Sequence, residues 1–188
     1  MSSLKEKKKK LREEYKRRRD AYVGQLDTAS RNLSFRRPPS PLSRLIKQDQ
    51  TVAIYRSVGS EAPTTRLIEY LTEIGASIAL PRVTEDGHLD FRLVSGADIL
   101  VTGFRNIPEP DESCALADPD MIIAPLVAFD RSLRRLGQGG GHYDRSFGKH
   151  PDVPRIGLAW SVQEADEIPT EPHDVTLHMI VTECEIIE

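Results

Sequence analysis

The sequence predicts an α/β fold: a single layered domain over residues 1–188, in which helices flank a mostly parallel central sheet. Short apolar runs of strand length alternate along the chain with stretches of helical periodicity, an order typical of strand–helix–strand units. The chain has 188 residues, of which 38% are hydrophobic and 29% charged, as in one globular domain. Its most apolar run enters a glycine-rich segment that a helical stretch follows, an arrangement that recurs in α/β folds.

The first expected element is a charged helix over residues 4–23, with Gly24 as its stop. Residues 34–41, with the sequence Ser-Phe-Arg-Arg-Pro-Pro-Ser-Pro, are expected to form a loop, because three prolines in four positions do not continue a helix. The apolar seam of the first helix is thin and recurs at helical spacing in Leu4, Leu11, Tyr15 and Tyr22.

The sheet is expected to begin with a short buried strand over residues 51–55, which a turn at residues 57–60 follows. A helix then opens at Ala62-Pro63 and ends at Gly75. The apolar residues of this helix share one face and are Leu67, Ile68, Leu71 and Ile74. The remaining strands are expected over residues 77–80, 89–93, 121–129, 155–159 and 178–181.

Three segments differ in composition from the buried strands. Residues 89–93 alternate between apolar and polar side chains, which is typical of an edge or hairpin strand. Residues 105–119 are acidic and rich in loop-forming residues, so we expect an irregular connection. Residues 143–147 are expected to begin a helix directly after the glycine-rich segment.

Charge is divided unevenly along the chain. Residues 1–37 contain 13 Lys and Arg against 5 Asp and Glu, and the remaining residues contain 13 against 24, for a net charge of −3. No Lys or Arg follows Arg155. This division suggests a basic N-terminal arm that either meets a polyanion or folds back on an acidic body.

Several classes of protein are not expected. No apolar run approaches the roughly 20 residues of a membrane-spanning helix, and the basic start lacks the apolar stretch of a secretory signal. Cys114 and Cys184 fit no metal spacing and are expected to be reduced thiols. The basic arm lacks an aromatic platform or a recognised nucleic-acid module. We therefore expect a cytoplasmic protein without membrane or nucleic-acid partners. We also expect a monomer.

The strongest functional signal is the segment of residues 135–145, Arg-Leu-Gly-Gln-Gly-Gly-Gly-His-Tyr-Asp-Arg. Its glycines let backbone N–H groups approach a bulky anion, while the two arginines and Asp144 add groups for phosphate and a cation. It lacks the Gly-Lys-Ser/Thr of Walker A and the spacing of a dinucleotide fingerprint. The segment predicts a nucleotide-phosphate site with a place for magnesium; the alternative is a glycine turn without function.

Three further features admit a structural as well as a functional explanation. Lys8 and Arg12 lie one helical turn apart and could reach one phosphate chain, although a basic run alone is usually a solvated face. Glu61 follows a strand end, where α/β folds bind ligands, but an acid there also offsets the dipole of the next helix. Asp174 could complete a magnesium site with Asp144, although an isolated aspartate is typical of polar loops.

Together these residues resemble the 5-formyltetrahydrofolate cyclo-ligase family, also called methenyltetrahydrofolate synthetase, almost from end to end. Residues 8–12 are similar to the family's N-terminal Lys-x-x-Leu-Arg, and residues 54–64 to its strand and Glu-x-x-Thr element. Residues 80–82, Leu-Pro-Arg, and 106–110, Asn-Ile-Pro-Glu-Pro, recur in the family's order. Residues 135–144 are similar to its signature, Arg-Leu-Gly-x-Gly-Gly-Gly-x-Tyr-Asp.

The resemblance implies a Rossmann-like fold of the sugar-phosphate isomerase and coenzyme A-transferase kind. It implies a ligase that uses ATP and magnesium to convert 5-formyltetrahydrofolate to 5,10-methenyltetrahydrofolate, with ADP and phosphate as products, through an iminium phosphate. The basic helix over residues 4–23 would pack onto the acidic body and complete the ATP site. The alternatives are a family member acting on another small amide-like substrate, or a non-catalytic nucleotide- or RNA-binding module.

The resemblance also assigns roles to individual residues. The expected catalytic residues are Arg135, Tyr143 and Asp144; magnesium is assigned to Asp144 and Asp174; folate is assigned to Arg56, Glu61 and Tyr143, with Glu61 on the donor edge of the pterin. ATP is assigned to Lys8, Lys9, Lys10, Leu11, Arg12, Arg135, Leu136, Gly137, Gln138, Gly139, Gly140, Gly141, His142 and Tyr143.

The chain departs from the family pattern at three positions. Leu133 stands where a glycine is common, and His142 stands where the family usually has tyrosine. An imidazole can keep the stacking and hydrogen bonding of that tyrosine, so we expect a modest effect. His178 replaces an aspartate that often follows the magnesium aspartate by four residues. None of these changes removes a phosphate-binding group.

Overall fold

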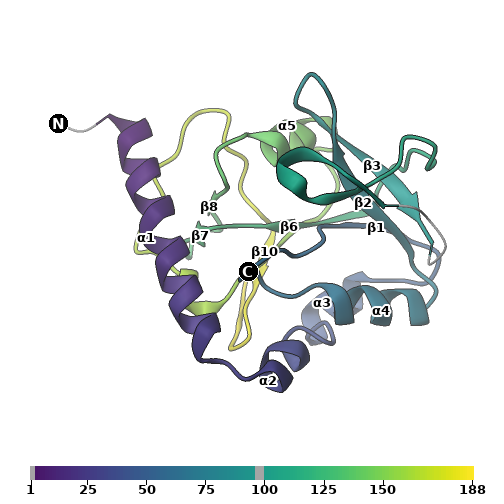
Figure 1. Cartoon of the computed structure of the whole chain (residues 1–188), viewed down its shortest axis with the longest axis horizontal. Coiled ribbons are helices and arrows are strands. Elements are labelled where there is room, and N and C mark those ends of the chain that lie inside the picture. The colour runs from purple at the N-terminus through teal and green to yellow at the C-terminus, as the bar shows by residue number, and fades with distance from the viewer. Residues whose placement is uncertain (1–2, 96–99) are drawn as a thin grey trace.

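The computed structural model describes residues 3–95 and 100–188 and confirms the predicted α/β fold (Figure 1). The strands of the central sheet are β1 (Thr51–Ile54), β2 (Ser77–Val83), β3 (Leu89–Val94), β6 (Met121–Pro125), β9 (Arg155–Leu158), β10 (Met179–Val181) and β11 (Ile186–Ile187). They form a seven-stranded sheet in the order β11-β10-β9-β6-β1-β2-β3. From β10 to β2 in this order, every pair of neighbouring strands is parallel. The edge strands β3 and β11 are antiparallel to their neighbours. The predicted mostly parallel sheet is therefore present.

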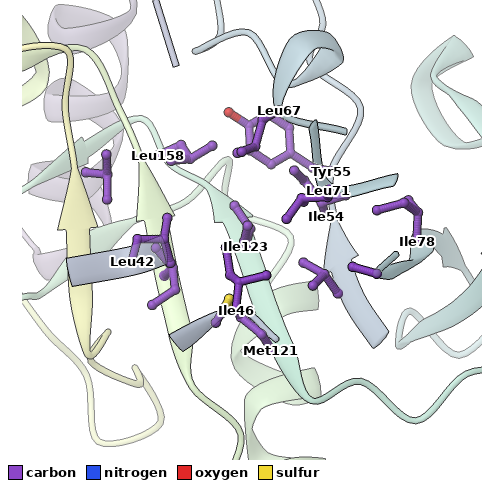
Figure 2. Close-up of a cluster of buried hydrophobic side chains, with 14 of the residues drawn as sticks. Leu42, Ile46, Ile54, Tyr55, Leu67, Leu71, Ile78, Met121, Ile123 and Leu158 are labelled. Carbon is purple, nitrogen blue, oxygen red and sulfur yellow. The ribbon is translucent and has the colours of Figure 1, made fainter. Parts of the chain in front are cut away.

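Successive residues of the central strands pack on opposite faces of the sheet. Val52 and Ile54 of β1 belong to one buried cluster, whereas Ala53 between them belongs to another. Met121 and Ile123 likewise face the first cluster, part of which is shown in Figure 2. Because a strand buried on both faces has apolar side chains at every position, these segments read as continuous apolar runs in the sequence.

Helices cover both faces of this sheet. In Figure 1, α3 (Ser40–Leu45) and α4 (Thr65–Glu73) lie below it, and α5 (His142–Lys149) lies above. Leu42, Leu67 and Leu71 of the lower helices are fully buried in the first cluster, and Phe147 of α5 is buried in the second. A short helix, α2 (Thr28–Leu33), precedes α3. The predicted helices thus complete a three-layered arrangement.

Several of the expected element boundaries are wrong. The helix expected over residues 4–23 continues through Gly24 to Gln25, and the helix expected to open at Ala62-Pro63 begins at Thr65. The loop expected over residues 34–41 ends early, since α3 begins at Ser40 with Pro41 in its first turn, where the missing N–H removes no helical hydrogen bond. The single strand expected over residues 121–129 is two strands. The first, β6, ends at Pro125; the second, β7 (Ala128–Phe129), leaves the sheet to form a hairpin with β8 (Arg135–Leu136).

Two antiparallel hairpins contain strand residues that the sequence did not predict, one of them partly within the irregular connection expected over residues 105–119. The strand expected at residues 77–80 continues to Val83, because β2 pairs with β3 along its whole second half. Within residues 105–119, the short strand β5 (Pro108–Pro110) pairs with β4 (Leu100–Thr102), and the 3-10 turn η1 (Phe104–Asn106) connects them. Proline and glycine content alone does not reveal such short paired segments.

The basic arm is the long helix α1 (Leu4–Gln25), which stands beside β7 and β8 at one end of the molecule (Figure 1). Ser3 and Glu6 form a reciprocal capping box at its start. Tyr15 is buried against a small cluster that includes Val127 and Leu136. No helix among the described residues is long and apolar enough to cross a membrane.

Strand order locates the place for a ligand. The chain passes from β1 to β2 on one side, and β6 later pairs with β1 on the other side, so the order reverses between β1 and β6. In open α/β sheets, ligands bind at the carboxyl ends of the strands beside such a reversal. Tyr55 and Pro125 stand at those two ends.

Candidate functional site

A cavity of about 410 Å³ opens at the carboxyl ends of β1 and β6, and Tyr55 and Pro125 line it. Its polar lining comes from α1, from the glycine loop (residues 137–141) and from residues 171–174. Its apolar lining comes from the β2–β3 hairpin and the η1–β5 segment, and includes Leu80, Val83, Leu89, Phe104, Ile107 and Pro108. In Figure 1, α1 and this hairpin stand on opposite sides of β1 and β6. The cavity therefore combines a charged wall with an apolar one.

Apart from Gln138, the glycine loop presents backbone rather than side chains to the cavity. Gly139 has φ of +101° and Gly141 has φ of +66°, values that residues with a Cβ rarely adopt. A Cβ at Gly140 would lie 2.5 Å from Nε2 of His142. Gly141 is also the N-cap of α5 and brings no side chain to the free amides of its first turn. Such a loop before a helix is suited to phosphate.

Gly139→Ala is expected to lower the free energy of unfolding by about 1–3 kcal/mol, because alanine is strained at a positive φ. Its Cβ would also lie 3.3 Å from Cζ of Arg12. Gly148→Ala is the matched control: this glycine lies inside α5 without positive φ, and a Cβ there meets nothing within 4 Å. The control should gain about 0.5–1 kcal/mol in urea unfolding. Equal effects of the two substitutions would contradict the backbone argument.

Arg135 and Asp144 form a nearly buried ion pair at the base of the loop. Nη2 of Arg135 lies 2.9 Å from Oδ2 of Asp144, with side-chain exposures of 4% and 18%. The guanidinium carbon of Arg135 also lies 5.1 Å from the centre of the Phe147 ring. The backbone N–H of Val175 donates to Oδ1 of Asp144 at 3.4 Å. The pair thus joins the glycine loop to the segment that carries Asp174.

Lys8 reaches across from α1 to two carboxylates of that segment. Its Nζ lies 2.8 Å from Oε2 of Glu171 and 2.5 Å from Oδ2 of Asp174. Burial lowers the pKa of Lys8, but the hydrogen bonds with Asp174 and Glu171 outweigh burial and raise it overall. Burial raises the pKa of Asp174, but the bond from Lys8 and a backbone N–H outweigh it and lower the pKa overall. All three groups are therefore charged at neutral pH.

The other residues of the basic segment 8–12 lie on different faces of α1. Nε of Arg12 donates to the carbonyl of Gly137 at 2.8 Å, so α1 contacts the glycine loop directly. Lys9 and Lys10 are exposed and do not line the cavity, and Leu11 packs against the small apolar cluster beneath α1. Positions one turn apart share a helix face, which brings Lys8 and Arg12 to the cavity and leaves the residues between them outside it.

Glu61 is a buried carboxylate in the cavity wall. Its Oε2 accepts the backbone N–H of Val58 at 3.0 Å. Burial raises its pKa, and the Val58 hydrogen bond and the charge of Arg19 oppose this only in part. Enclosure and the charge of Glu61 raise the pKa of the Tyr143 hydroxyl, which also lines the cavity and stays neutral. Arg56, in contrast, is an exposed side chain at the cavity.

The residues assigned to magnesium fit such an ion chemically. Asp144 and Asp174 both line the cavity and offer carboxylate oxygens, the donors that magnesium combines with phosphate oxygens. One ligand atom each from Glu171, His173 and Asp174 lie within 4.8 Å of one another. Each assigned carboxylate pairs with a cation of the chain, Arg135 or Lys8, so a metal would compete with that cation.

The three departures from the family pattern have distinct structural settings. Leu133 has φ of +61°, which explains why glycine suits this position. Nδ1 of His142 lies 2.6 Å from the carbonyl of Gly87, and its ring meets Phe104 edge-on. Nδ1 of His178 accepts the backbone N–H of Arg155, away from the cavity. The side chain of Arg145 also turns away from the cavity, toward the Gly87 carbonyl.

Two groups of cavity residues were not predicted from the sequence. Glu171 and His173 share a loop with Asp174, and only the folded position of Lys8 singles them out. Glu109 is buried, and its Oε1 accepts the backbone N–H of Phe104 at 3.1 Å, which fixes the turn that carries Phe104. The one indication of Glu109 in the sequence is its place between two prolines, in Ile-Pro-Glu-Pro.

Comparisons with known proteins agree with this geometry. The model of the 5-formyltetrahydrofolate cyclo-ligase family matches residues 4–183. The 5-formyltetrahydrofolate cyclo-ligase of Escherichia coli K12 is 34% identical over 146 residues, covering 73% of this chain and 80% of its own. That of Mycolicibacterium smegmatis is 33% identical over 150 residues, covering 75% and 77%. The structure of Aquifex aeolicus 5,10-methenyltetrahydrofolate synthetase superposes with a TM-score of 0.74 at 27% identity, covering 95% of this chain and 91% of its own. The chain therefore belongs to the 5-formyltetrahydrofolate cyclo-ligase family and is an enzyme of the ligase class.

Proposed function

We propose that this enzyme uses ATP and magnesium to convert 5-formyltetrahydrofolate to 5,10-methenyltetrahydrofolate, releasing ADP and phosphate. The observation that carries the proposal is the composition of the cavity. A glycine loop and two cations of α1 meet there with an apolar wall, and the buried carboxylate of Glu61 also lines the cavity. The first group suits a triphosphate, and the second suits a ring system with hydrogen-bond donors on its edge. Membership of the family supports both assignments.

The reaction needs activation because the formyl group on the ring nitrogen is amide-like and its oxygen leaves poorly. In the proposed sequence, the formyl oxygen bonds to the γ-phosphorus as the bond from that phosphorus to ADP breaks, which gives an iminium phosphate. The neighbouring secondary amine attacks the formyl carbon and loses its proton. The carbon–oxygen bond then breaks, phosphate leaves, and the methenyl bridge remains. Alignment and charge neutralisation are the main tasks of a protein in phosphoryl transfer.

The nucleotide would lie between the glycine loop and α1. The loop amides would bind phosphate oxygens, and Lys8 and Arg12 would neutralise their charge from the other side. Arg135 would orient Asp144 through their ion pair, which also holds the loop against α5. Asp144 and Asp174 would hold magnesium, which supplies positive charge next to the phosphate oxygens. Lys8 would exchange its two carboxylate partners for phosphate when the nucleotide binds.

The folate would lie along the apolar wall. Glu61 would accept hydrogen bonds from the donor edge of the pterin, and Tyr143, beside both Glu61 and Arg135, would line the junction of the two substrates. Arg56 is exposed at the cavity and would face an anionic part of the folate. The position of each group at the cavity supports its proposed role.

An absorbance assay for the methenyl product tests the proposal, with and without ATP. Purified protein is expected to form the product only when ATP, magnesium and 5-formyltetrahydrofolate are all present. ATP turnover that 5-formyltetrahydrofolate does not stimulate would favour another amide-like substrate. RNA binding that weakens steeply with salt, without folate-dependent ATP turnover, would replace the proposal by the binding-module alternative.

Glu61→Gln is expected to raise the KM for 5-formyltetrahydrofolate about 10- to 100-fold, because a hydrogen bond to a charged group contributes roughly 1.5–3 kcal/mol. Its pKa is raised by burial, so the carboxylate takes up a proton at a higher pH than an ordinary glutamate as the pH falls. Folate affinity of the wild type should fall through that pH, and the variant should lack this limb.

The control for this prediction is Glu73→Gln, which neutralises an exposed glutamate of α4. The control should retain the KM and the acid limb of the wild type. A Glu61→Gln variant with unchanged KM and an intact acid limb would remove Glu61 from the substrate contacts.

A further inference from the structure

The helix that carries Lys8 and Arg12 makes a second buried polar contact two turns further on. Arg19 has an exposed fraction of only 7%, although its side chain is charged. Its Nε donates to Oγ of Ser60 at 2.9 Å, and the same hydroxyl donates to Asp20. Its Nη1 is buried without a hydrogen-bond partner among the described residues. Burying the charge of an arginine costs free energy unless the guanidinium is paired and fully hydrogen-bonded. The burial of Arg19, on a helix that is otherwise mostly exposed, therefore points to a specific role.

Ser60 precedes Glu61, and the loop of residues 57–62 is held on several sides. The indole N–H of Trp160 donates to the Ser60 carbonyl at 3.0 Å. The Tyr55 hydroxyl donates to the carbonyl of Ala62 at 2.7 Å. Contacts from α1, from the strand end and from Trp160 thus fix the backbone on both sides of Glu61. Two contacts on this loop bring a positive charge: that of Arg19 with Ser60, and that of Arg31 with the carbonyl of Gly59. The charge of Arg19 acts on the Glu61 carboxylate.

The groups around the Glu61 carboxylate come from several elements. α1 contributes the charges of Arg19 and Lys16, and the glycine loop contributes a hydrogen bond from Gln138. The hydroxyls of Tyr55 and Tyr143 face it from the end of β1 and from α5. Burial raises the pKa of Glu61, whereas the Val58 N–H, Arg19, Gln138 and Lys16 lower it, in that order. Arg19 is therefore the strongest cationic influence on its ionisation.

We propose that Arg19 is a positioning residue for the Glu61 carboxylate, the proposed folate contact. It fixes Ser60, and so the loop of residues 57–62, and it keeps Glu61 ionised at the cavity wall. The inference rests on the proposed function, because it takes Glu61 to be a folate contact. It adds a second role for α1: one end of the helix contributes nucleotide contacts and the other end prepares the folate contact.

Steady-state kinetics of Arg19→Ala, Arg19→Lys and Arg18→Ala test this role. Arg18 neighbours Arg19 but is exposed and pairs with Glu14, so its replacement controls for loss of charge from α1. Arg19→Ala is expected to raise the KM for 5-formyltetrahydrofolate about tenfold, on the scale of one charged hydrogen bond. The KM for ATP should stay within about twofold, because Arg19 does not line the cavity beside Lys8 and Arg12.

The pH profile separates positioning from general loss of structure. Without Arg19 the pKa of Glu61 rises further, so the acid limb of kcat/KM for folate should move to higher pH. Arg19→Lys keeps the charge and should restore this limb, while its KM remains between those of the wild type and Arg19→Ala. Arg18→Ala should match the wild type in KM and in pH profile. The fluorescence of Trp160, the single tryptophan, reports on the loop independently of activity.

Several results would overturn the inference. One is an Arg19→Ala variant with the KM and acid limb of the wild type; another is an equal rise of both KM values with no shift of the limb. If Arg19→Ala does not fold, Ser60→Ala decides: it removes the bridging hydroxyl and should raise the folate KM severalfold without affecting ATP. An unchanged folate KM in Ser60→Ala would then overturn the inference. Absence of product with wild-type protein would contradict the proposed function itself.

Discussion

Asp144→Asn is expected to reduce kcat for methenyl formation about 100- to 1,000-fold, the scale seen when one preorganised electrostatic group is removed from an active site. Asparagine preserves the shape of the side chain and an oxygen that can accept from Arg135, but it removes the charge proposed to hold magnesium. The magnesium concentration required for half-maximal activity should rise as well. Stopped and continuous absorbance assays across a magnesium series measure both effects.

The substitution also has a cost in stability that must be measured separately. The Arg135 side chain is 4% exposed and pairs with Asp144, so weakening the pair should lower the free energy of unfolding by roughly 1–3 kcal/mol. Circular dichroism at the assay temperature should nevertheless show folded protein. Asp152→Asn, at an exposed position, is the control and should match the wild type. An unchanged kcat in Asp144→Asn would exclude Asp144 from catalysis and from the magnesium site.

The double replacement of Lys8 and Arg12 by alanine is expected to raise the KM for ATP about 100-fold or more, since each charged contact to phosphate contributes roughly 1.5–3 kcal/mol. Both side chains line the cavity from α1. The KM for 5-formyltetrahydrofolate should change much less, because Glu61 and its loop are held at the other end of the helix. Initial rates with each substrate varied in turn measure the two constants.

Lys9→Ala is the matched control for this helix. Lys9 has the same charge as Lys8 but is exposed, 4.0 Å from Glu13, and does not line the cavity. It should leave both KM values unchanged. If the double variant and Lys9→Ala behaved alike, the basic arm would be a solvated face rather than part of the ATP site. The melting temperature of the double variant should fall, because Glu171 and Asp174 lose their shared cation.

Local patterns predicted the architecture well where the pattern was long. The alternation of apolar runs with helical stretches gave the α/β class, and the alternating residues 89–93 correctly predicted a hairpin strand at the edge. Patterns failed where pairing depends on distant partners. The apolar run at residues 121–129 contains no turn signal other than Pro125, and its division into β6 and β7 depends on β8. The apolar residues of this run show that it is buried, but not that the chain changes direction within it.

In the candidate site, too, local features were predictable from the sequence and contacts between distant residues were not. The glycine loop was apparent from its composition, because few other functions require so many glycines beside arginine and aspartate. The sequence placed Lys8 and Arg12 on one helix face, but it did not show that Leu133 adopts a positive φ, nor single out Glu171 as a partner of Lys8. Arg19 looked like one more residue in a basic run, although it is buried against Ser60. These properties depend on which residues approach one another in space.

By itself, the sequence determined the layered α/β class, the family, and the chemical character of the glycine loop, because periodicity and glycine spacing are local properties of the chain. Only the tertiary structure decided which face of α1 closes the cavity and which carboxylates pair with its cations. Contacts between residues 100 or more positions apart, such as Lys8 with Asp174 and Trp160 with Ser60, hold the charged wall and the loop of Glu61 in place. Burial and charge pairing are set by such contacts, and no local pattern encodes them.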